Sequence, residues 1–241
     1  TNADFKYQYP NLTTAGAWRT GGAMNTARWT LAGFGSQTAA LGAGGESPAG
    51  NEATTELYNG TSWTEVNDLN TAKQLVTGTG TQTAGLTIGG SAPPTPTGVA
   101  ITESWNGSAW TEVADLNTAR RQLASAGIQT AALAFGGGIP NKANTETWNG
   151  SSWTEVADLN TARSGLGGVG VSNTAALAFG GAGPTAITES WNGTSWTEVA
   201  DLNTARNDIS GAGASNTSAL AFGGYPATAV TELWNGSAWT E

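Results

Sequence analysis

The sequence predicts an all-β protein, a five-bladed β-propeller made of four-stranded antiparallel blades. The string Asn-Thr-Ala-Arg, once Asn-Thr-Ala-Lys, recurs every 43 to 47 residues, beginning at Asn25, Asn70, Asn117, Asn160 and Asn203. A period of roughly 20 to 50 residues indicates a solenoid, a propeller or another repeat array. Each unit also contains an Asn-Gly dipeptide between strand-like runs, the strongest short-range signal of a β-hairpin. No segment keeps the apolar spacing of a helix.

The third unit shows the expected elements in order. A first strand is expected at Leu123–Ala126, ended by Gly127, and a second at Thr130–Phe135, ended by a Gly doublet. The third and fourth strands are expected at Thr145–Trp148 and Trp153–Val156, joined by the Asn-Gly turn. Gly and Ala fill the first two strands, as a narrow ring needs near its axis, and the Trp residues lie farther out. Most Trp side chains are therefore expected to pack within or between blades.

Blade count and ring closure follow from the fourth-strand Trp column. The column has six members, whereas the other strands occur five times; the members are Trp18, Trp63, Trp110, Trp153, Trp196 and Trp239. We expect the strand from Trp18 to Asn25 to complete the blade that residues 206–239 build, and so to close the ring. A fragment of a longer array and a six-bladed ring lacking about one unit are the alternatives. Residues 1–12 are expected to be an N-terminal extension, and residues 13–241 the propeller.

Composition excludes several chemistries. The chain has no His and no Cys, which removes Ser-His-Asp and Cys nucleophiles, disulfides, and thiolate or imidazole metal sites. A formal net charge of −9 argues against a nucleic-acid partner, which favours a basic surface. No apolar run is long enough to insert into a membrane, and residues 1–12 lack the features of a signal peptide. We therefore expect no cofactor and no metal.

Three acidic columns and one basic column repeat with the blades. They contain 14 of the 18 acidic residues and 5 of the 9 basic ones. The columns are Glu56, Glu103, Glu146, Glu189 and Glu232; Glu65, Glu112, Glu155, Glu198 and Glu241; Asp68, Asp115, Asp158 and Asp201; and Arg28, Lys73, Arg120, Arg163 and Arg206. A catalytic pair of acids occurs once, in an asymmetric setting. We expect these columns to tie turns and neighbouring blades, with a repeated Ca²⁺ site as the alternative.

The repeat resembles the kelch family over nearly the whole chain. Each unit has a Gly doublet, then a Glu and an aromatic residue, then a Trp; the third unit has Gly136-Gly137, Glu146, Trp148 and Trp153. An Arg follows the Trp by ten residues, as from Trp110 to Arg120. An aromatic-Asn-Gly sequence replaces the aromatic-Asp usual in kelch repeats. In this respect the chain is similar to Thr-, Ala- and Asn-rich kelch-like repeats of environmental, mainly marine, phages.

The loops between the second and third strands predict the binding face. They have 10, 12, 8, 7 and 7 residues, whereas the turns at the opposite face are tight. Loops on a rigid scaffold often carry binding, with neutral drift of exposed loops as the alternative; the kelch resemblance implies a shared ligand face here. Blade one is the most irregular, and its Trp29 lies outside the repeat. The candidate partner-binding residues are Trp29, Glu46, Asn51, Glu52, Pro93, Pro94, Asn141, Lys142, Pro184, Tyr225 and Pro226.

Three functions are compatible with these features. The first is a non-catalytic structural or attachment module of a phage particle, such as a capsid decoration or tail-fibre protein, located on the virion or an extracellular surface. Its partners would be other virion or surface proteins, or cell-surface glycans. The second is a carbohydrate-binding propeller lectin with aromatic platforms, for which some repeated Trp must be exposed. The third is an enzyme: kelch oxidases need His and Cys for copper, and a glycosidase would depend on the non-repeat acids Asp4, Glu46, Glu52 and Asp208.

Overall fold

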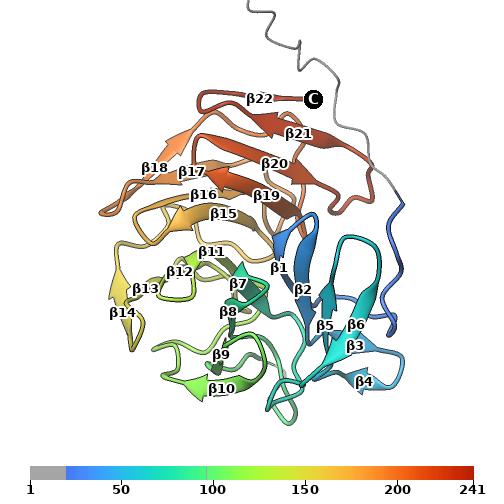
Figure 1. The fold of residues 1–241 in the computed structure, drawn as a ribbon. Helices are drawn as coiled ribbons and strands as arrows, with labels where there is room; N and C mark the ends of the chain where they lie inside the picture. Colours follow the sequence, from blue (N-terminus) through green and yellow to red (C-terminus); the bar gives the residue numbers. More distant parts are fainter. Residues whose placement is uncertain (1–19, 96) are drawn as a thin grey trace, which may run out of the picture.

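The computed structural model describes residues 20–95 and 97–241 and shows five four-stranded antiparallel blades arranged as a β-propeller (Figure 1). Within each blade the strands follow the chain from the axis outward. Blades 1 and 2 contain β1 (Ala32–Ser36), β2 (Ala39–Ala43), β5 (Thr55–Tyr58) and β6 (Trp63–Val66), then β7 (Thr77–Thr81), β8 (Ala84–Ile88), β9 (Thr102–Trp105) and β10 (Trp110–Val113). Blade 3 contains β11 (Ala124–Ile128), β12 (Ala131–Phe135), β13 (Thr145–Trp148) and β14 (Trp153–Val156).

Blades 4 and 5 repeat the same order. They contain β15 (Gly167–Ser172), β16 (Ala175–Phe179), β17 (Thr188–Trp191) and β18 (Trp196–Val199), then β19 (Ser210–Ser215), β20 (Ser218–Phe222), β21 (Thr231–Trp234) and β22 (Trp239–Thr240). A separate short hairpin, β3 (Glu46–Ser47) and β4 (Gly50–Asn51), forms in the loop of blade 1. The predicted fold class is thereby confirmed. In the third unit, the predicted third and fourth strands coincide with β13 and β14.

One strand end was predicted wrongly. Gly127 does not end the first strand of blade 3, because β11 continues through it to Ile128. Gly127 adopts a φ of +107°, and a Cβ there would collide with the carbonyl oxygen of Ala131. Glycine can adopt this conformation without strain, so it bends the strand into the turn and leaves the pairing intact.

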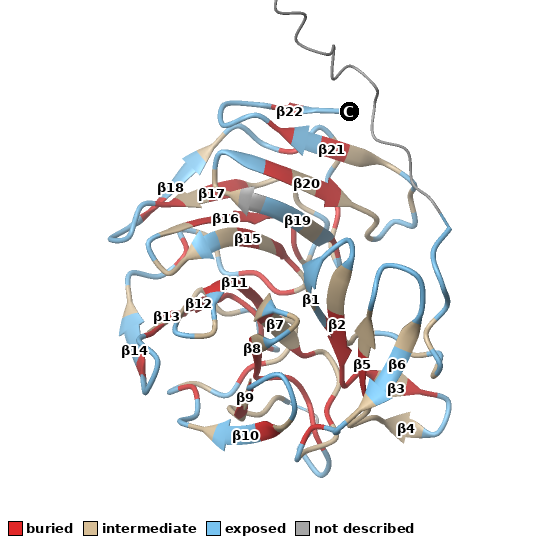
Figure 2. Ribbon diagram, in the orientation of Figure 1, coloured by how far each residue is buried: buried red, intermediate tan, exposed pale blue. Residues whose placement is uncertain are grey.

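The hydrophobic core lies between blades. Figure 2 shows buried residues concentrated on the second strands, such as β2, β8 and β16, with largely exposed outer hairpins. At the interface of blades 3 and 4, Leu133 and Phe135 pack with Trp191 and Trp196, and the Phe135 and Trp196 ring centroids lie 4.9 Å apart. Eight repeated Trp side chains are at most 6% exposed, namely Trp105, Trp110, Trp148, Trp153, Trp191, Trp196, Trp234 and Trp239. The prediction that the Trp columns are packing residues is confirmed for these eight.

Two repeated hydrogen bonds join successive blades. The fourth-strand indole of one blade donates to the first Thr of the third strand in the preceding blade; the pairs are Trp110–Thr55, Trp153–Thr102, Trp196–Thr145 and Trp239–Thr188, at 3.0 to 3.2 Å. In the turn between the first two strands, a Gln or Asn amide donates to the preceding blade, as from Gln82 to the Tyr58 carbonyl oxygen at 2.7 Å. Each of these four interfaces thus combines apolar burial with satisfied polar groups.

The prediction that the N-terminal strand from Trp18 to Asn25 completes blade 5 is wrong. The fourth strand of that blade is β22, where Trp234 pairs with Trp239. A four-residue hairpin loop joins β21 to β22 locally, which makes this pairing easy to form. Residues 20–25 form no strand, and their contacts are with blade 1: the Trp63 indole donates to the Gly22 carbonyl oxygen at 3.1 Å. Trp18, and the predicted extension 1–12, lie outside the described residues.

Candidate functional site

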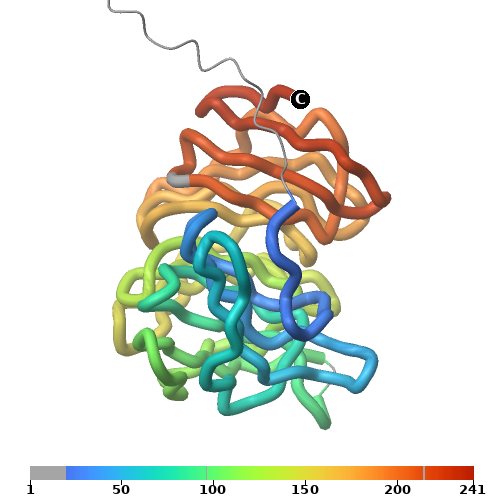
Figure 3. Tube along the Cα trace, turned by 45° about the vertical axis from the view of Figure 1, so that its right-hand side comes forward, coloured from blue at the N-terminus to red at the C-terminus, as the bar shows by residue number. Residues whose placement is uncertain are grey.

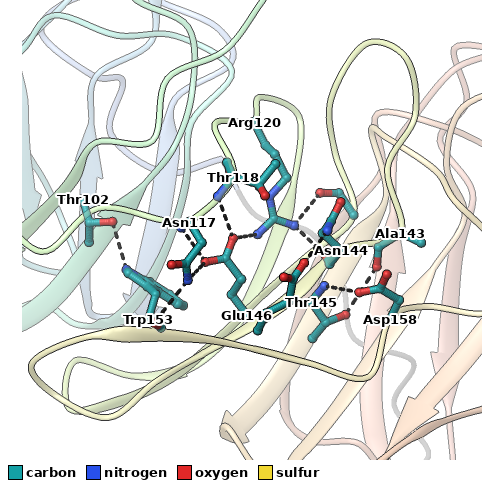
Figure 4. A network of polar contacts seen from close by, with 12 residues as sticks. Thr102, Asn117, Thr118, Arg120, Ala143, Asn144, Thr145, Glu146, Trp153 and Asp158 are labelled. Atoms are coloured by element: carbon teal, nitrogen blue, oxygen red, sulfur yellow. Dashed lines mark hydrogen bonds and ion pairs between the residues drawn. The ribbon is translucent and has the colours of Figure 1, made fainter.

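A buried polar network repeats in every blade, and Figure 4 shows it in blade 3. The Glu146 carboxylate accepts hydrogen bonds from the Asn117 backbone and side chain at 2.7 and 2.8 Å, and from Arg120 Nη2 at 2.8 Å. Arg120 Nη1 donates to the carbonyl oxygens of Gly136 and Asn144, at 3.0 and 2.5 Å. Both charged side chains are fully buried. The network therefore fixes the connection that enters the blade against the Gly doublet and the third strand.

The acidic columns have structural partners. The first pairs with the basic column at 2.8 to 3.3 Å in all five blades. In the third column, Asp158 Oδ1 accepts from the Thr145 backbone N–H at 3.1 Å, and Asp68, Asp115 and Asp201 do the same in their blades. The second column is exposed on the outermost strands, or directly after the strand in the case of Glu241, where charge discourages edge-to-edge pairing. Within residues 20–95 and 97–241, no group of three acidic side chains could hold a metal ion.

Lys73 is the one departure from Arg in the basic column. Its Nζ lies 3.3 Å from Glu103 Oε1 without hydrogen-bond geometry, whereas the Arg residues each add bonds to backbone carbonyl oxygens. Burial lowers the pKa of Lys73 below its ordinary value of 10.5, and the nearby Glu103 opposes this shift. Burial likewise lowers the pKa of Arg120, with Glu146 opposing. Blade 2 therefore holds the weakest of the five networks.

The substitution Lys73→Arg is expected to raise the free energy of unfolding by about 1 kcal/mol at pH 7, through new hydrogen bonds to backbone carbonyls. Between the lowered pKa of Lys73 and 10.5, the folded protein binds fewer protons than the unfolded chain, so wild-type stability rises with pH. Arg does not titrate in this window. The difference in free energy of unfolding between the variant and the wild type should therefore narrow as the pH approaches 10.5. Urea unfolding of both proteins from pH 7 to 10 measures this difference. A stability difference that stays constant or widens would contradict a lowered pKa for the buried Lys73.

A central pocket is rimmed by a ring of residues with left-handed backbone conformation. The residue two after each column Arg or Lys has a φ of +50° to +61°; the five are Thr30, Leu75, Gln122, Gly165 and Asp208. Backbone hydrogen bonds link four of them in succession, from Gln122 to Leu75, Gly165 to Gln122, and Asp208 to Gly165, at 2.7 to 3.0 Å. They line a central pocket of about 650 Å³ together with the first residues of the innermost strands. Left-handed non-glycine residues are strained, and they concentrate at functional sites.

A second ring surrounds this mouth. In each blade the residue after the column Arg or Lys bonds to the residue after the Gly doublet, as in the paired backbone bonds of Trp29 with Glu46 and of Asn207 with Tyr225, at 2.7 to 3.0 Å. We call these two rings, with the loops between the second and third strands, the loop face. Blade 1 adds a side-chain bond, from the Trp29 indole to Glu46 Oε2 at 3.0 Å.

The predicted site residues all lie on the loop face, but only some meet. Trp29, Glu46 and Tyr225 stand in the second ring, and Trp29 and Tyr225 are 48% and 63% exposed. Asn51 reaches the Ser91 carbonyl oxygen of blade 2, Asn141 accepts from Ser164, and Glu52 accepts from Ser47, so these side chains also support the loops. The others stand in the loops of blades 2 to 5; they are Pro93, Pro94, Lys142, Pro184 and Pro226.

Sequence reasoning did not find the left-handed ring as a site. Its members share no residue type, so only their constant offset from the column Arg or Lys could have identified them. Gln122 Nε2 lies 3.4 Å from Asp208 Oδ1, which brings two blades together across the mouth. Asp208 had been noted only as a non-repeat acid.

No protein-family model matches the sequence, and a search of curated proteins finds no significant match. In the described part of the chain, no helix has the length and apolar character needed to cross a bilayer.

Proposed function

We propose that the protein is a non-catalytic binding module that contacts its partner through the loop face. The supporting observation is a contrast between the two faces of the ring. On the opposite face the hairpin turns are nearly identical, and each turn Asn accepts the backbone N–H groups of the two residues after the Gly, as Asn106 and Asn149 do at 2.9 to 3.0 Å.

On the loop face the side chains diverge while the backbone contacts repeat. The second ring carries Trp29, Gln74, Arg121, Ser164 and Asn207 at one position, and Glu46, Ser91, Gly138, Ala182 and Tyr225 at the other. A face whose backbone is fixed and whose side chains differ from blade to blade suits one asymmetric partner. The two most exposed aromatic side chains of this face, Trp29 and Tyr225, are natural anchors.

The role we assign to this module is structural or attachment work in a phage particle, as a capsid decoration or tail-fibre component. This assignment rests on the kelch-like motif and on its Thr-, Ala- and Asn-rich variant, and a five-bladed propeller agrees with it. Its partners would be other virion or surface proteins, and its place the virion or an extracellular surface. Mass spectrometry of purified particles should find the protein at many copies; its presence only in the soluble host fraction would contradict the assignment.

A carbohydrate is the second candidate ligand, at one site and not at the repeated sites that the sequence suggested. A lectin with repeated Trp platforms needs exposed column residues, and eight of those described are buried, with Trp63 half-buried. The remaining aromatic surface on the loop face is Trp29 and Tyr225, in blades 1 and 5. A glycan would therefore bind once, on the loop face, and not five times around the ring.

A glycan-array screen of the full chain, with and without Ca²⁺, tests this form. A hit should weaken at least about tenfold with Trp29→Ala, as loss of a stacking anchor worth ~1.4 kcal/mol or more predicts. Ile128→Ala is the matched control, because Ile128 is 45% exposed, close to the 48% of Trp29, but stands on the opposite face. Equal effects of the two substitutions on glycan binding would exclude the loop face as the binding surface. A clean negative screen would leave protein partners as the ligand class.

A further inference from the structure

Blade 2 departs from the repeat twice at one place in its polar network. The first departure is Lys73, which stands where the other four blades have Arg. The second is Thr87, the cross-strand partner of Glu103. In the other blades the partner of the column Glu is Ala or Gly, namely Gly42, Ala134, Ala178 and Ala221. Directly opposed residues of an antiparallel pair lie on the same face of the sheet, so both departures change the surroundings of one carboxylate.

Three buried polar atoms of this cluster have no hydrogen-bond partner among residues 20–95 and 97–241. They are Lys73 Nζ, Glu103 Oε1 and Thr87 Oγ1, and all three residues are fully buried. The Lys73 and Glu103 atoms lie 3.3 Å apart as an ion pair, but this contact lacks hydrogen-bond geometry. Burying a polar group without a hydrogen bond costs free energy, so such groups are satisfied in folded proteins by a neighbour or by an internal water.

The blades with Arg show what a guanidinium does in this place. In blade 3, Arg120 Nη2 donates to Glu146 at 2.8 Å. The Nη1 atom donates in another direction, to the carbonyl oxygens of Gly136 and Asn144 (Figure 4). Blades 4 and 5 repeat both Nη1 bonds, and the acceptors there are Gly180, Ile187, Gly223 and Val230. The guanidinium thus joins the column Glu to two backbone carbonyls.

The corresponding carbonyl oxygens in blade 2 belong to Gly89 and Ile101, and Lys73 Nζ forms a hydrogen bond to neither. The backbone that carries them is arranged as in blade 3. Gly89 N donates to Ile101 O at 3.0 Å, and Gly136 N donates to Asn144 O at the same distance. A Lys side chain ends in one nitrogen and lacks the second that Arg supplies. Blade 2 is packed between blades 1 and 3 and is drawn in teal to green in Figure 3, so both of its faces are covered.

We propose that blade 2 binds one internal water molecule in the place that Nη1 occupies in the blades with Arg. The water accepts a hydrogen bond from Lys73 Nζ and donates to the carbonyl oxygens of Gly89 and Ile101. Three partners are typical of a buried water. The ammonium and the water together then make the contacts that one guanidinium makes in the other blades. The Thr87 hydroxyl adds a further polar group beside the ion pair, which favours a hydrated site over an apolar one.

Magnetic relaxation dispersion of water ¹⁷O in solutions of the full chain tests this site, because the method counts long-lived internal water molecules. Lys73→Arg should lower the count by one, since the guanidinium supplies the hydrogen bonds of the displaced water. Arg120→Lys makes the reverse change in blade 3 and should raise the count by one. The matched control is Arg121→Lys, the same change at a half-buried residue outside the column, which should leave the count unchanged.

Two results of this experiment would overturn the proposal. One is an unchanged count in Lys73→Arg, and the other is an equal change in Arg120→Lys and Arg121→Lys. A high-resolution crystal structure of the wild-type chain gives a second readout that needs no substitution. A water within hydrogen-bond distance of Lys73 Nζ and of the Gly89 and Ile101 carbonyl oxygens would support the proposal. Lys73 Nζ bonded directly to both oxygens would overturn it. Neither readout depends on the identity of the loop-face ligand.

Discussion

Glu146→Gln is expected to destabilise the propeller by about 3–5 kcal/mol, because it leaves the Arg120 guanidinium buried without a counter-charge. Gln is nearly isosteric with Glu, so the loss is electrostatic and not a matter of volume. The carboxylate also accepts bonds from the Asn117 backbone and side chain, and a Gln amide can accept only on one of its two atoms. A loss of this size is a large fraction of the stability of an ordinary domain.

The control for this substitution lies on the neighbouring strand. Glu155 pairs directly with Glu146 across β13 and β14 but is exposed, and Glu155→Gln should change stability by less than about 0.5 kcal/mol. Urea unfolding followed by Trp fluorescence measures both. If the two substitutions cost the same, the buried pair adds nothing specific, and the repeated columns would need another explanation, such as a role in binding.

Sequence alone predicts the architecture of this protein well, for physical reasons tied to particular residues. Asn149-Gly150 strongly favours a hairpin turn, in which Gly150 adopts a φ of +96°, and this turn sets the register of both flanking strands. A Gly doublet after Phe135 ends the second strand, because both glycines adopt positive φ. Repetition then multiplies these local signals fivefold, and the Glu and Arg columns were correctly assigned to structure because no single catalytic pair repeats around a ring.

The candidate site was only partly predictable. Loop length and irregularity located the loop face, including Trp29 and Tyr225. The left-handed ring escaped prediction because Leu75 and Gln122 are not residue types that indicate positive φ; the surrounding bridges impose it. Ring closure was mispredicted because the sequence does not show that Trp239 and Thr240 alone suffice for a fourth strand in blade 5. The structure shows β22 in that place.

Gly127→Ala is expected to cost about 3 kcal/mol or more, the second large effect predicted for this chain. Gly127 has a φ of +107°, which an L-residue with a side chain rarely adopts, and the new Cβ would approach Ala132 Cα to 2.9 Å as well as collide with the Ala131 carbonyl oxygen. The contacting atoms are backbone atoms of the paired strand, so no side chain can move to relieve them.

Gly33→Ala separates this effect from a general sensitivity of the inner strands. Gly33 stands in the innermost strand of blade 1, as Gly127 does in blade 3, but a Cβ there meets nothing within 4 Å. This substitution should change stability by less than about 1 kcal/mol, in either direction, because it mainly reduces the freedom of the unfolded chain. Thermal unfolding of the two variants decides between two explanations, a general need for small residues near the axis and a specific need for glycine at the bend. A similar loss in both would mean that small size near the axis is what the ring needs, whereas a loss at Gly127 alone would mean that the bend before the turn requires glycine.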